Sequence, residues 1–213
     1  MEHAFWHARW TEGRIGFHQS DVNSKLLSYW PQLELTGTEP VFVPLCGKSG
    51  DMLWLREQGH PVLGVELNDS ACRAFFAENE GVPQTESRGR YQYLSMDGIG
   101  LLCGDVFALT AGDLAQVGAV YDRAALVALP PEMRADYARL LCECLPAGVS
   151  ILLVVVEFEG EQGPPFAVFQ PEIEALFGGR FEIRSLMQPD PMVKRQDRAY
   201  LLLDKAEVTG KAK

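Results

Sequence analysis

The sequence has few positive charges and no cluster of them. Its 213 residues include 19 lysines and arginines against 29 aspartates and glutamates, which gives a formal net charge of −10. Proteins that bind nucleic acid or an anionic membrane do so through clustered Lys and Arg side chains. The composition therefore argues against both partners, and a small molecule is the expected ligand.

The cysteine patterns of disulfide frameworks and zinc ribbons are also missing. The five cysteines are odd in number and form no pair separated by two residues, so neither feature is predicted. Reduced thiols are typical of cytosolic proteins, and we expect a cytoplasmic location. His3 and His7 stand four residues apart without an apparent third ligand, so we predict no metal site.

Long apolar runs are absent as well. The longest, residues 149–156, is far shorter than the ~20 residues that a membrane helix needs. The N-terminal residues have neither the basic nor the apolar region of a secretory signal. The sequence therefore predicts no membrane segment, and residues 149–156 read as a buried strand.

The remaining composition is that of one globular domain. Apolar residues make up 47% of the chain, which is enough for a globular core, and the sequence contains no internal repeat. We expect a single domain over residues 1–204, in which residues 1–35 form a helical cover of the active site. Residues 205–213 are small and polar, and they predict a disordered tail. No exposed apolar seam stands out, so we expect a monomer.

The N-terminal region predicts two helices. Trp6 and Trp10 are spaced to share one helical face. A second helix is predicted from Ser20, a residue suited to capping a helix start, and includes Val22 and Trp30 on its apolar side.

After residue 40, short apolar runs alternate with helical patterns. The predicted strands are residues 41–43, 62–65, 101–103, 119–121, 149–156, 181–186 and 199–203. Helical patterns follow the first, second, fourth and fifth of these runs, whereas none separates the last two. The alternation predicts an α/β fold with a mostly parallel, doubly wound sheet and a terminal antiparallel strand. Ligands of such sheets bind beyond the carboxyl ends of the strands.

The loop after the first strand contains Leu45 and Gly47 in the run PLCGKSGD. A phosphate-binding P-loop needs a glycine five residues before Gly47, but Phe42 stands there. A dinucleotide fingerprint needs a further glycine besides Gly47 and Gly50. Two interpretations stay open, a plain strand–helix turn and a loop around the amino-acid part of S-adenosylmethionine.

Glu66 ends the second strand, 19 residues after Gly47. A carboxylate there can accept both hydroxyl hydrogens of an adenosine ribose, a group that NAD and S-adenosylmethionine share. Alternatively, Glu66 is a solvated acid at a strand end. Asp105 and Val106 follow the third strand and could contact adenine, although an Asp that caps a helix explains the position equally well.

Arg123 ends the fourth strand. Its guanidinium can hold a carboxylate of the cofactor or of a substrate, or form a structural ion pair with Asp122. Trp6, Trp10 and Phe17 could close the pocket, because aromatic faces attract a cation such as a sulfonium. The alternative is that the tryptophans pack a terminal helix on the sheet.

Taken together, four segments resemble the thiopurine S-methyltransferase family. These are FWHARWTEGRIGFHQ, VFVPLCGKSGDMLWLREQGHPVLGVE, YDRAALVAL and GPPF, and the similarity extends from Phe5 to Asp204. The resemblance implies a Rossmann-like class I methyltransferase fold, S-adenosylmethionine as cofactor, and a small thiol as acceptor, as in bacterial-type members. Such members are also associated with selenium and tellurium compounds.

The resemblance further implies a role for individual residues. No side chain is assigned as a catalytic base, since aromatic thiols ionise near neutral pH. Cofactor contacts are expected at Trp10, Leu45, Gly47, Glu66, Asp105, Val106 and Arg123, and substrate contacts at Trp6, Phe17 and Arg123. Two other classes of function stay open on the sequence: an NAD-dependent oxidoreductase and a non-catalytic module that binds an adenosyl ligand.

Overall fold

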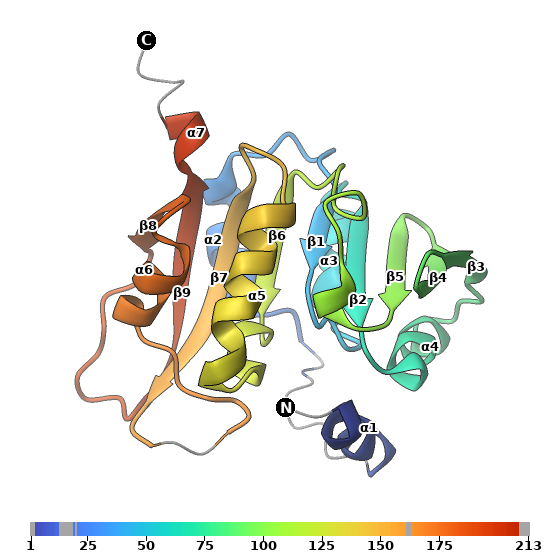
Figure 1. Ribbon diagram of the computed structural model, residues 1–213, viewed down its shortest axis with the longest axis horizontal. Coiled ribbons are helices and arrows are strands. Elements are labelled where there is room, and N and C mark those ends of the chain that lie inside the picture. The colour runs from blue at the N-terminus through green and yellow to red at the C-terminus, as the bar shows by residue number, and fades with distance from the viewer. Residues whose placement is uncertain (1–2, 13–18, 20, 161–162, 209–213) are drawn as a thin grey trace.

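A sheet of nine strands, all within the described residues, forms the centre of the molecule. The computed structural model describes residues 3–12, 19, 21–160 and 163–208. The strand order is β3-β4-β5-β2-β1-β6-β7-β9-β8 (Figure 1). Five neighbouring strands are parallel: β1 (Val41–Val43), β2 (Val62–Glu66), β5 (Ile99–Cys103), β6 (Ala119–Arg123) and β7 (Ser150–Phe158). The predicted parallel sheet is confirmed.

The last two strands lie at one edge of this sheet. β9 (Arg195–Asp204) runs antiparallel between β7 and β8 (Phe181–Ser185). This confirms the antiparallel strand that was predicted from the missing helix between the last two apolar runs.

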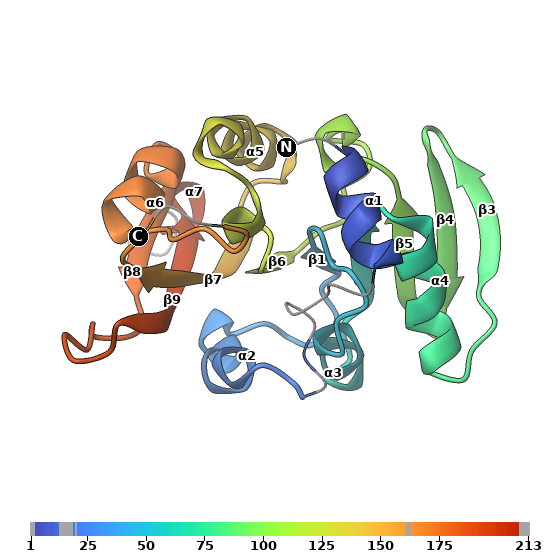
Figure 2. The ribbon, with the colours of Figure 1, turned by 90° about the horizontal axis from the view of Figure 1, so that it is seen from below.

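Helices cover both faces of the sheet (Figure 2). One face carries α2 (Ser24–Tyr29), η1 (Trp30–Leu33), α3 (Asp51–Glu57) and α4 (Asp69–Glu78). The other carries η2 (Val106–Ala108), η3 (Leu126–Ala128), α5 (Pro131–Cys144) and α6 (Gln170–Phe177). Helix α1 (His3–Thr11) lies beyond the carboxyl ends of the parallel strands.

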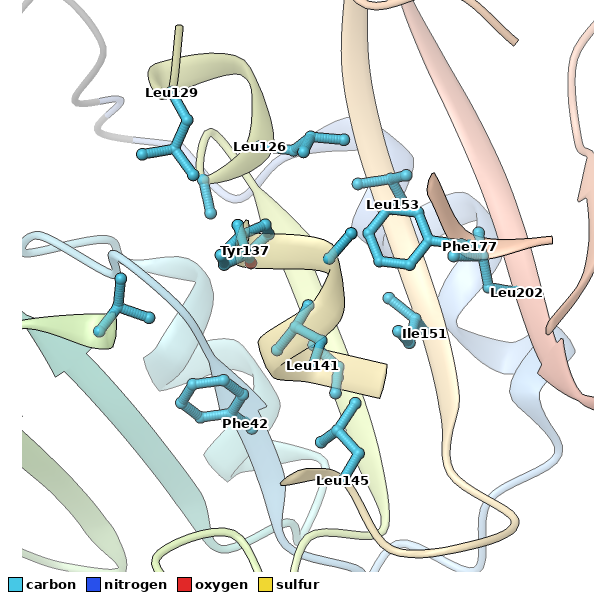
Figure 3. Close-up of a cluster of buried hydrophobic side chains, with 14 of the residues drawn as sticks. Phe42, Leu126, Leu129, Tyr137, Leu141, Leu145, Ile151, Leu153, Phe177 and Leu202 are labelled. Carbon is cyan, nitrogen blue, oxygen red and sulfur yellow. The ribbon is translucent and has the colours of Figure 1, made fainter. Parts of the chain in front are cut away.

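Each face of the sheet has its own apolar core, since neighbouring strand residues point to opposite faces. On the α5 side, Ile151 and Leu153 of β7 meet Tyr137 and Leu141 of α5 and Phe177 of α6 (Figure 3). Burial of each such side chain contributes about 1.5–3 kcal/mol. This double core fixes the strand ends from which the site is built.

An antiparallel hairpin at the other edge was not predicted. β3 (Gln84–Arg88) and β4 (Tyr91–Met96) precede β5. β3 pairs with β4, and β4 pairs with β5. The strand expected at residues 101–103 is therefore the fifth in the chain rather than the third. Every residue of β3 is exposed, so it carries no apolar signal that a sequence pattern would reveal.

The start of α2 differs from the expectation. Asn23 caps this helix, and its Oδ1 accepts a hydrogen bond of 2.9 Å from the backbone N–H of Lys25. Ser20, the predicted cap, lies outside the described residues. Asn23 directly precedes the first helical residue, Ser24, so its side chain can accept a hydrogen bond from a free N–H group of the first turn.

Asn23→Ala should destabilise the protein by about 1 kcal/mol, because it removes this cap. Thermal unfolding is expected to show a Tm lower by roughly 2–4 °C. Asn23→Asp keeps an acceptor at the same place and serves as the control. Equal losses in both variants would contradict the capping role.

Residues 205–208 form a short helix, α7 (Lys205–Val208), where the sequence predicted a disordered tail. Hydrogen bonds hold its start. The Lys205 N–H donates to the carbonyl of Arg180, Lys205 Nζ to that of Gly178, and the Ala206 N–H to Asp204 Oδ1. Residues 209–213 lie outside the described part of the chain.

Candidate active site

A cavity of about 420 Å³ lies at the carboxyl ends of β1, β2, β5 and β6. Its volume is within the range of small-molecule sites. The structure brings together eight of the nine residues that the sequence assigned to the site, whereas Phe17 lies outside the described residues. The eight lining residues are Trp6, Trp10, Leu45, Gly47, Glu66, Asp105, Val106 and Arg123.

The loop after β1 approaches this cavity in an unusual backbone conformation. Leu45 and Gly47 both have positive φ angles, 45° and 53°, and Gly47 adopts this region without the strain that a side chain would bring. A Cβ atom on Gly47 would stand 3.3 Å from Cζ2 of Trp10. The indole of Trp10 therefore lies directly against the loop.

Glu66 is buried in the cavity wall, with 7% of its surface exposed. Its Oε2 accepts the N–H of Gly47 at 3.0 Å, and its Oε1 accepts the N–H of Asn68 at 2.8 Å. Burial raises the pKa of Glu66 to about 7, although these backbone hydrogen bonds oppose the shift. Each oxygen keeps a further lone pair for a ligand hydroxyl, so Glu66 is suited to hold a ribose.

Helix α1 is attached to the two loops that carry these groups. Trp10 packs against Gly47, and Nδ1 of His7 lies 3.0 Å from Nδ2 of Asn68, which follows β2. Trp6 also lines the cavity and meets Phe5 edge to face at 5.4 Å. These contacts place an aromatic helix over the carboxyl edge of the sheet (Figure 2).

Asp105 has the capping role that the sequence offered as an alternative. Its Oδ1 accepts the N–H of Phe107 at 2.9 Å and caps η2, while its carbonyl accepts the hydroxyl of Tyr91. Asp105 and the buried Val106 nevertheless both line the cavity. Capping holds this corner in place and leaves an apolar surface where adenine was expected.

Arg123 and Asp122 point to opposite faces of β6, as neighbouring strand residues do. Asp122 is buried towards α5, where its Oδ2 accepts the hydroxyl of Tyr137 at 2.7 Å, and burial raises its pKa to about 6. Nη1 of Arg123 instead lies 3.9 Å from Oδ2 of Asp51 in the cavity wall. The alternative of an Asp122–Arg123 ion pair is therefore wrong, and Arg123 faces the site.

Part of the wall lies beyond the cofactor and substrate contacts that were expected from the sequence. A largely apolar surface lies beyond the cofactor loops. It is formed by η3, α5, β7 and the segment that follows β7 and includes Pro164 and Pro165, and β9 adds two charged residues. The backbone N–H of Phe166 donates to the carbonyl of Val127 at 2.7 Å and ties that segment to η3. This part of the wall includes Val127, Leu129, Met133, Val156, Pro164, Pro165, Arg195 and Asp197.

Within the described residues, no group of three His, Cys, Asp or Glu side chains is placed to hold a metal ion. All five cysteines are free thiols. No helix in the described part of the chain is long and apolar enough to cross a membrane.

Comparison with known proteins decides between the classes of function that the sequence left open. The family model for thiopurine S-methyltransferase (TPMT) matches residues 1–207. The chain belongs to this family. Relatives named thiopurine S-methyltransferase include one from Marinobacter nauticus, 43% identical over 92% of this chain and 93% of that protein, and one from Nitrosospira multiformis, 48% identical over 91% and 89%.

Solved structures agree with this methyltransferase in fold. A Burkholderia thailandensis 1,6-didemethyltoxoflavin-N1-methyltransferase with bound S-adenosylhomocysteine has a TM-score of 0.68 at 17% identity, over 95% of this chain and 86% of that one. Magnesium protoporphyrin IX methyltransferase from Synechocystis has a TM-score of 0.66 at 11% identity, over 96% and 100%. These likenesses confirm the Rossmann-like class I fold.

The chain is an S-adenosylmethionine-dependent methyltransferase of the thiopurine S-methyltransferase family. This confirms the family, the fold and the cofactor expected from the sequence. The NAD-dependent oxidoreductase and the non-catalytic binding module are not favoured.

Proposed function

We propose that this methyltransferase transfers the methyl group of S-adenosylmethionine to the sulfur of small aromatic or heterocyclic thiols, including thiopurines. The composition of the cavity wall carries this proposal. The wall combines polar groups on Gly47, Glu66 and Arg123 with apolar side chains from η3, α5 and β7. A polar cofactor and a flat apolar acceptor can therefore share one space.

The residues of the cofactor part fit the group that they are proposed to hold. Glu66 would accept the ribose hydroxyls, the loop at Leu45 and Gly47 would contact the amino-acid part, and Val106 would pack on adenine next to Asp105. Trp10 covers the loop at Gly47. These roles rest on burial and on free acceptor positions at Glu66.

Arg123 would serve both ligands. Its guanidinium can bind a carboxylate or the negative charge of an ionised acceptor. Trp6 would cover the acceptor, together with Phe17, which lies outside the described residues. Selenium and tellurium compounds carry equally soft nucleophiles and are proposed as further acceptors.

The chemistry needs no base from the protein. S-adenosylmethionine supplies an electrophilic methyl group, which the ionised acceptor sulfur takes while the donor sulfur keeps the electron pair. Protein groups contribute by holding the two reactants in line, an effect that can reach ~7–11 kcal/mol. Burial beneath α1 and beside Pro164 and Pro165 would exclude water and keep the thiolate reactive.

We further propose a cytoplasmic monomer. Five free thiols fit a reducing compartment. One domain over residues 1–204 would contain the whole site, with residues 1–35 as its cover, because α1 contacts the loops after β1 and β2.

A screen of acceptors tests the proposed reaction. The purified protein, supplied with S-adenosylmethionine, is incubated with a thiopurine, a simple aromatic thiol, an aromatic selenol and an alcohol that matches the thiol in shape. Mass spectrometry should detect methylated thiol and no methylated alcohol. Methylation of the alcohol alone, or of no thiol, would contradict the proposal.

Val127→Thr tests the apolar part of the wall. The substitution keeps the shape of the side chain but places a hydroxyl in a buried position, which costs about 1 kcal/mol or more. KM for an aromatic thiol should rise about fivefold, while Kd for S-adenosylhomocysteine stays unchanged. A change in that Kd with KM intact would place Val127 with the cofactor instead.

A further inference from the structure

A buried acid in the wall of the cavity, Asp51, is not among the residues proposed to contact the cofactor or the acceptor. Asp51 begins α3 directly after the cofactor loop, and only 2% of its surface is exposed. Its Oδ1 accepts the backbone N–H of Asn23 at 2.8 Å, and its Oδ2 accepts the hydroxyl of Tyr121 at 2.9 Å. Both oxygens are thus held by fixed donors from two other elements.

The third neighbour of Asp51 is Arg123, but the two are not hydrogen-bonded. Their closest atoms are 3.9 Å apart, beyond the usual 2.7–3.2 Å of an N–H···O bond. Arg123 is 13% exposed and keeps its N–H groups for a ligand. Asp51 therefore offers Arg123 a compensating charge without occupying its donors.

Such compensation matters because of the charge of the cofactor. S-adenosylmethionine carries a positive sulfonium, whereas its product S-adenosylhomocysteine has a neutral thioether at that position. An uncompensated arginine at the junction of β1 and β6 would repel the sulfonium, and the repulsion is strong where water is excluded. Lys48, another cation of the wall, is paired with Glu78 at 2.5 Å.

We propose that Asp51 is a specificity-determining residue whose negative charge allows a sulfonium cofactor to bind beside Arg123. The inference rests on the proposed function, in which Arg123 faces both ligands. In this arrangement Arg123 still attracts an anionic group that contacts it directly. The negative charge of Asp51 offsets the repulsion between Arg123 and the sulfonium.

The test compares a charged ligand with its neutral product. Calorimetry gives the Kd of S-adenosylmethionine and of S-adenosylhomocysteine for the wild type and for Asp51→Asn. The amide oxygen can still accept from Asn23, and the amide N–H₂ can donate to the Tyr121 hydroxyl, so the packing is kept. S-adenosylmethionine should lose about tenfold more affinity than S-adenosylhomocysteine, which corresponds to about 1.4 kcal/mol.

Three controls separate charge from structure. Glu66→Gln should weaken both ligands alike, since both contain the ribose. Arg123→Ala should change the ratio of the two affinities in the opposite direction, in favour of S-adenosylmethionine. This variant provides the test if Asp51→Asn does not fold. The double variant should return the ratio to that of the wild type.

Equal weakening of both ligands by a folded Asp51→Asn would overturn the inference and leave the proposed function intact. An unchanged ratio in Arg123→Ala would overturn it as well. If the wild-type protein binds neither ligand, the cofactor site itself is wrong and the inference fails with it.

Discussion

Arg123→Ala is expected to lower kcat/KM for an anionic thiol about a hundredfold, or about 2.7 kcal/mol at ~1.36 kcal/mol for each tenfold. The reason is that Arg123 lies in the cavity wall with Asp51 too far away to occupy its donors. A thiolate or an acceptor carboxylate would then lose a charge-assisted hydrogen bond, which is among the stronger contacts in proteins. Steady-state kinetics with a carboxylated and an uncarboxylated aromatic thiol measure the effect.

Arg123→Lys is the matched control. It keeps the charge but loses the planar fork, so it should recover part of the activity on the anionic thiol. The uncarboxylated thiol should lose less activity than the anionic one in the alanine variant. Equal losses for both acceptors would exclude a contact between Arg123 and the acceptor carboxylate.

Glu66→Ala should weaken the binding of S-adenosylhomocysteine by about 1–3 kcal/mol, roughly 5- to 150-fold, because it removes a buried hydrogen-bonding partner. The same carboxylate holds the N–H groups of Gly47 and Asn68, so the loops that it joins would lose an acceptor too. Calorimetry gives the change in Kd, and thermal unfolding reports the structural part separately. Affinity equal to that of the wild type would exclude a ribose contact.

The pH dependence of binding gives a second signature of Glu66. Its pKa of about 7 lies above the ordinary 4.5, so its protonated form is favoured by folding. Its contribution to stability is full below about pH 4.5 and is lost as the pH rises through 7. Cofactor binding should show the opposite trend, because the carboxylate is the better acceptor: Kd should rise up to about tenfold from pH 8 to pH 6.

Glu66→Gln should remove this pH dependence, since an amide does not titrate in that range. Its Kd should be flat between about pH 6 and pH 8. A wild-type Kd that is equally flat would contradict the assignment of Glu66 as an ionising cofactor contact.

The central strands were predictable because each is a short apolar run. Burial on both faces gives residues 41–43 or 150–156 a signal that needs no tertiary information. β3 was missed for the opposite reason: an exposed edge strand of polar residues resembles a loop. The Rossmann-like core was therefore predictable from the sequence, whereas the hairpin of β3 and β4 was not.

The site follows the same division. Residues at strand ends, such as Glu66 and Arg123, were predicted because the carboxyl edge of a parallel sheet gathers them. The contacts of Asp51 join residues 28 and 70 positions apart, and no local pattern indicates such pairs. The sequence likewise did not predict which face of the sheet Arg123 lies on. The structure shows that the side chains of Arg123 and Asp122 point to opposite faces of β6.

The most direct test of the account is calorimetry of the wild-type protein with S-adenosylhomocysteine at about pH 8. The buried Glu66 beside the Gly47 loop predicts a Kd that is about micromolar or lower, corresponding to ~8 kcal/mol of binding free energy. Binding of this strength is the result that a cofactor site in the cavity at the carboxyl edge predicts. No binding up to about 1 mM would contradict the cofactor assignment of the cavity, and with it the functions proposed for Glu66, Asp51 and Arg123.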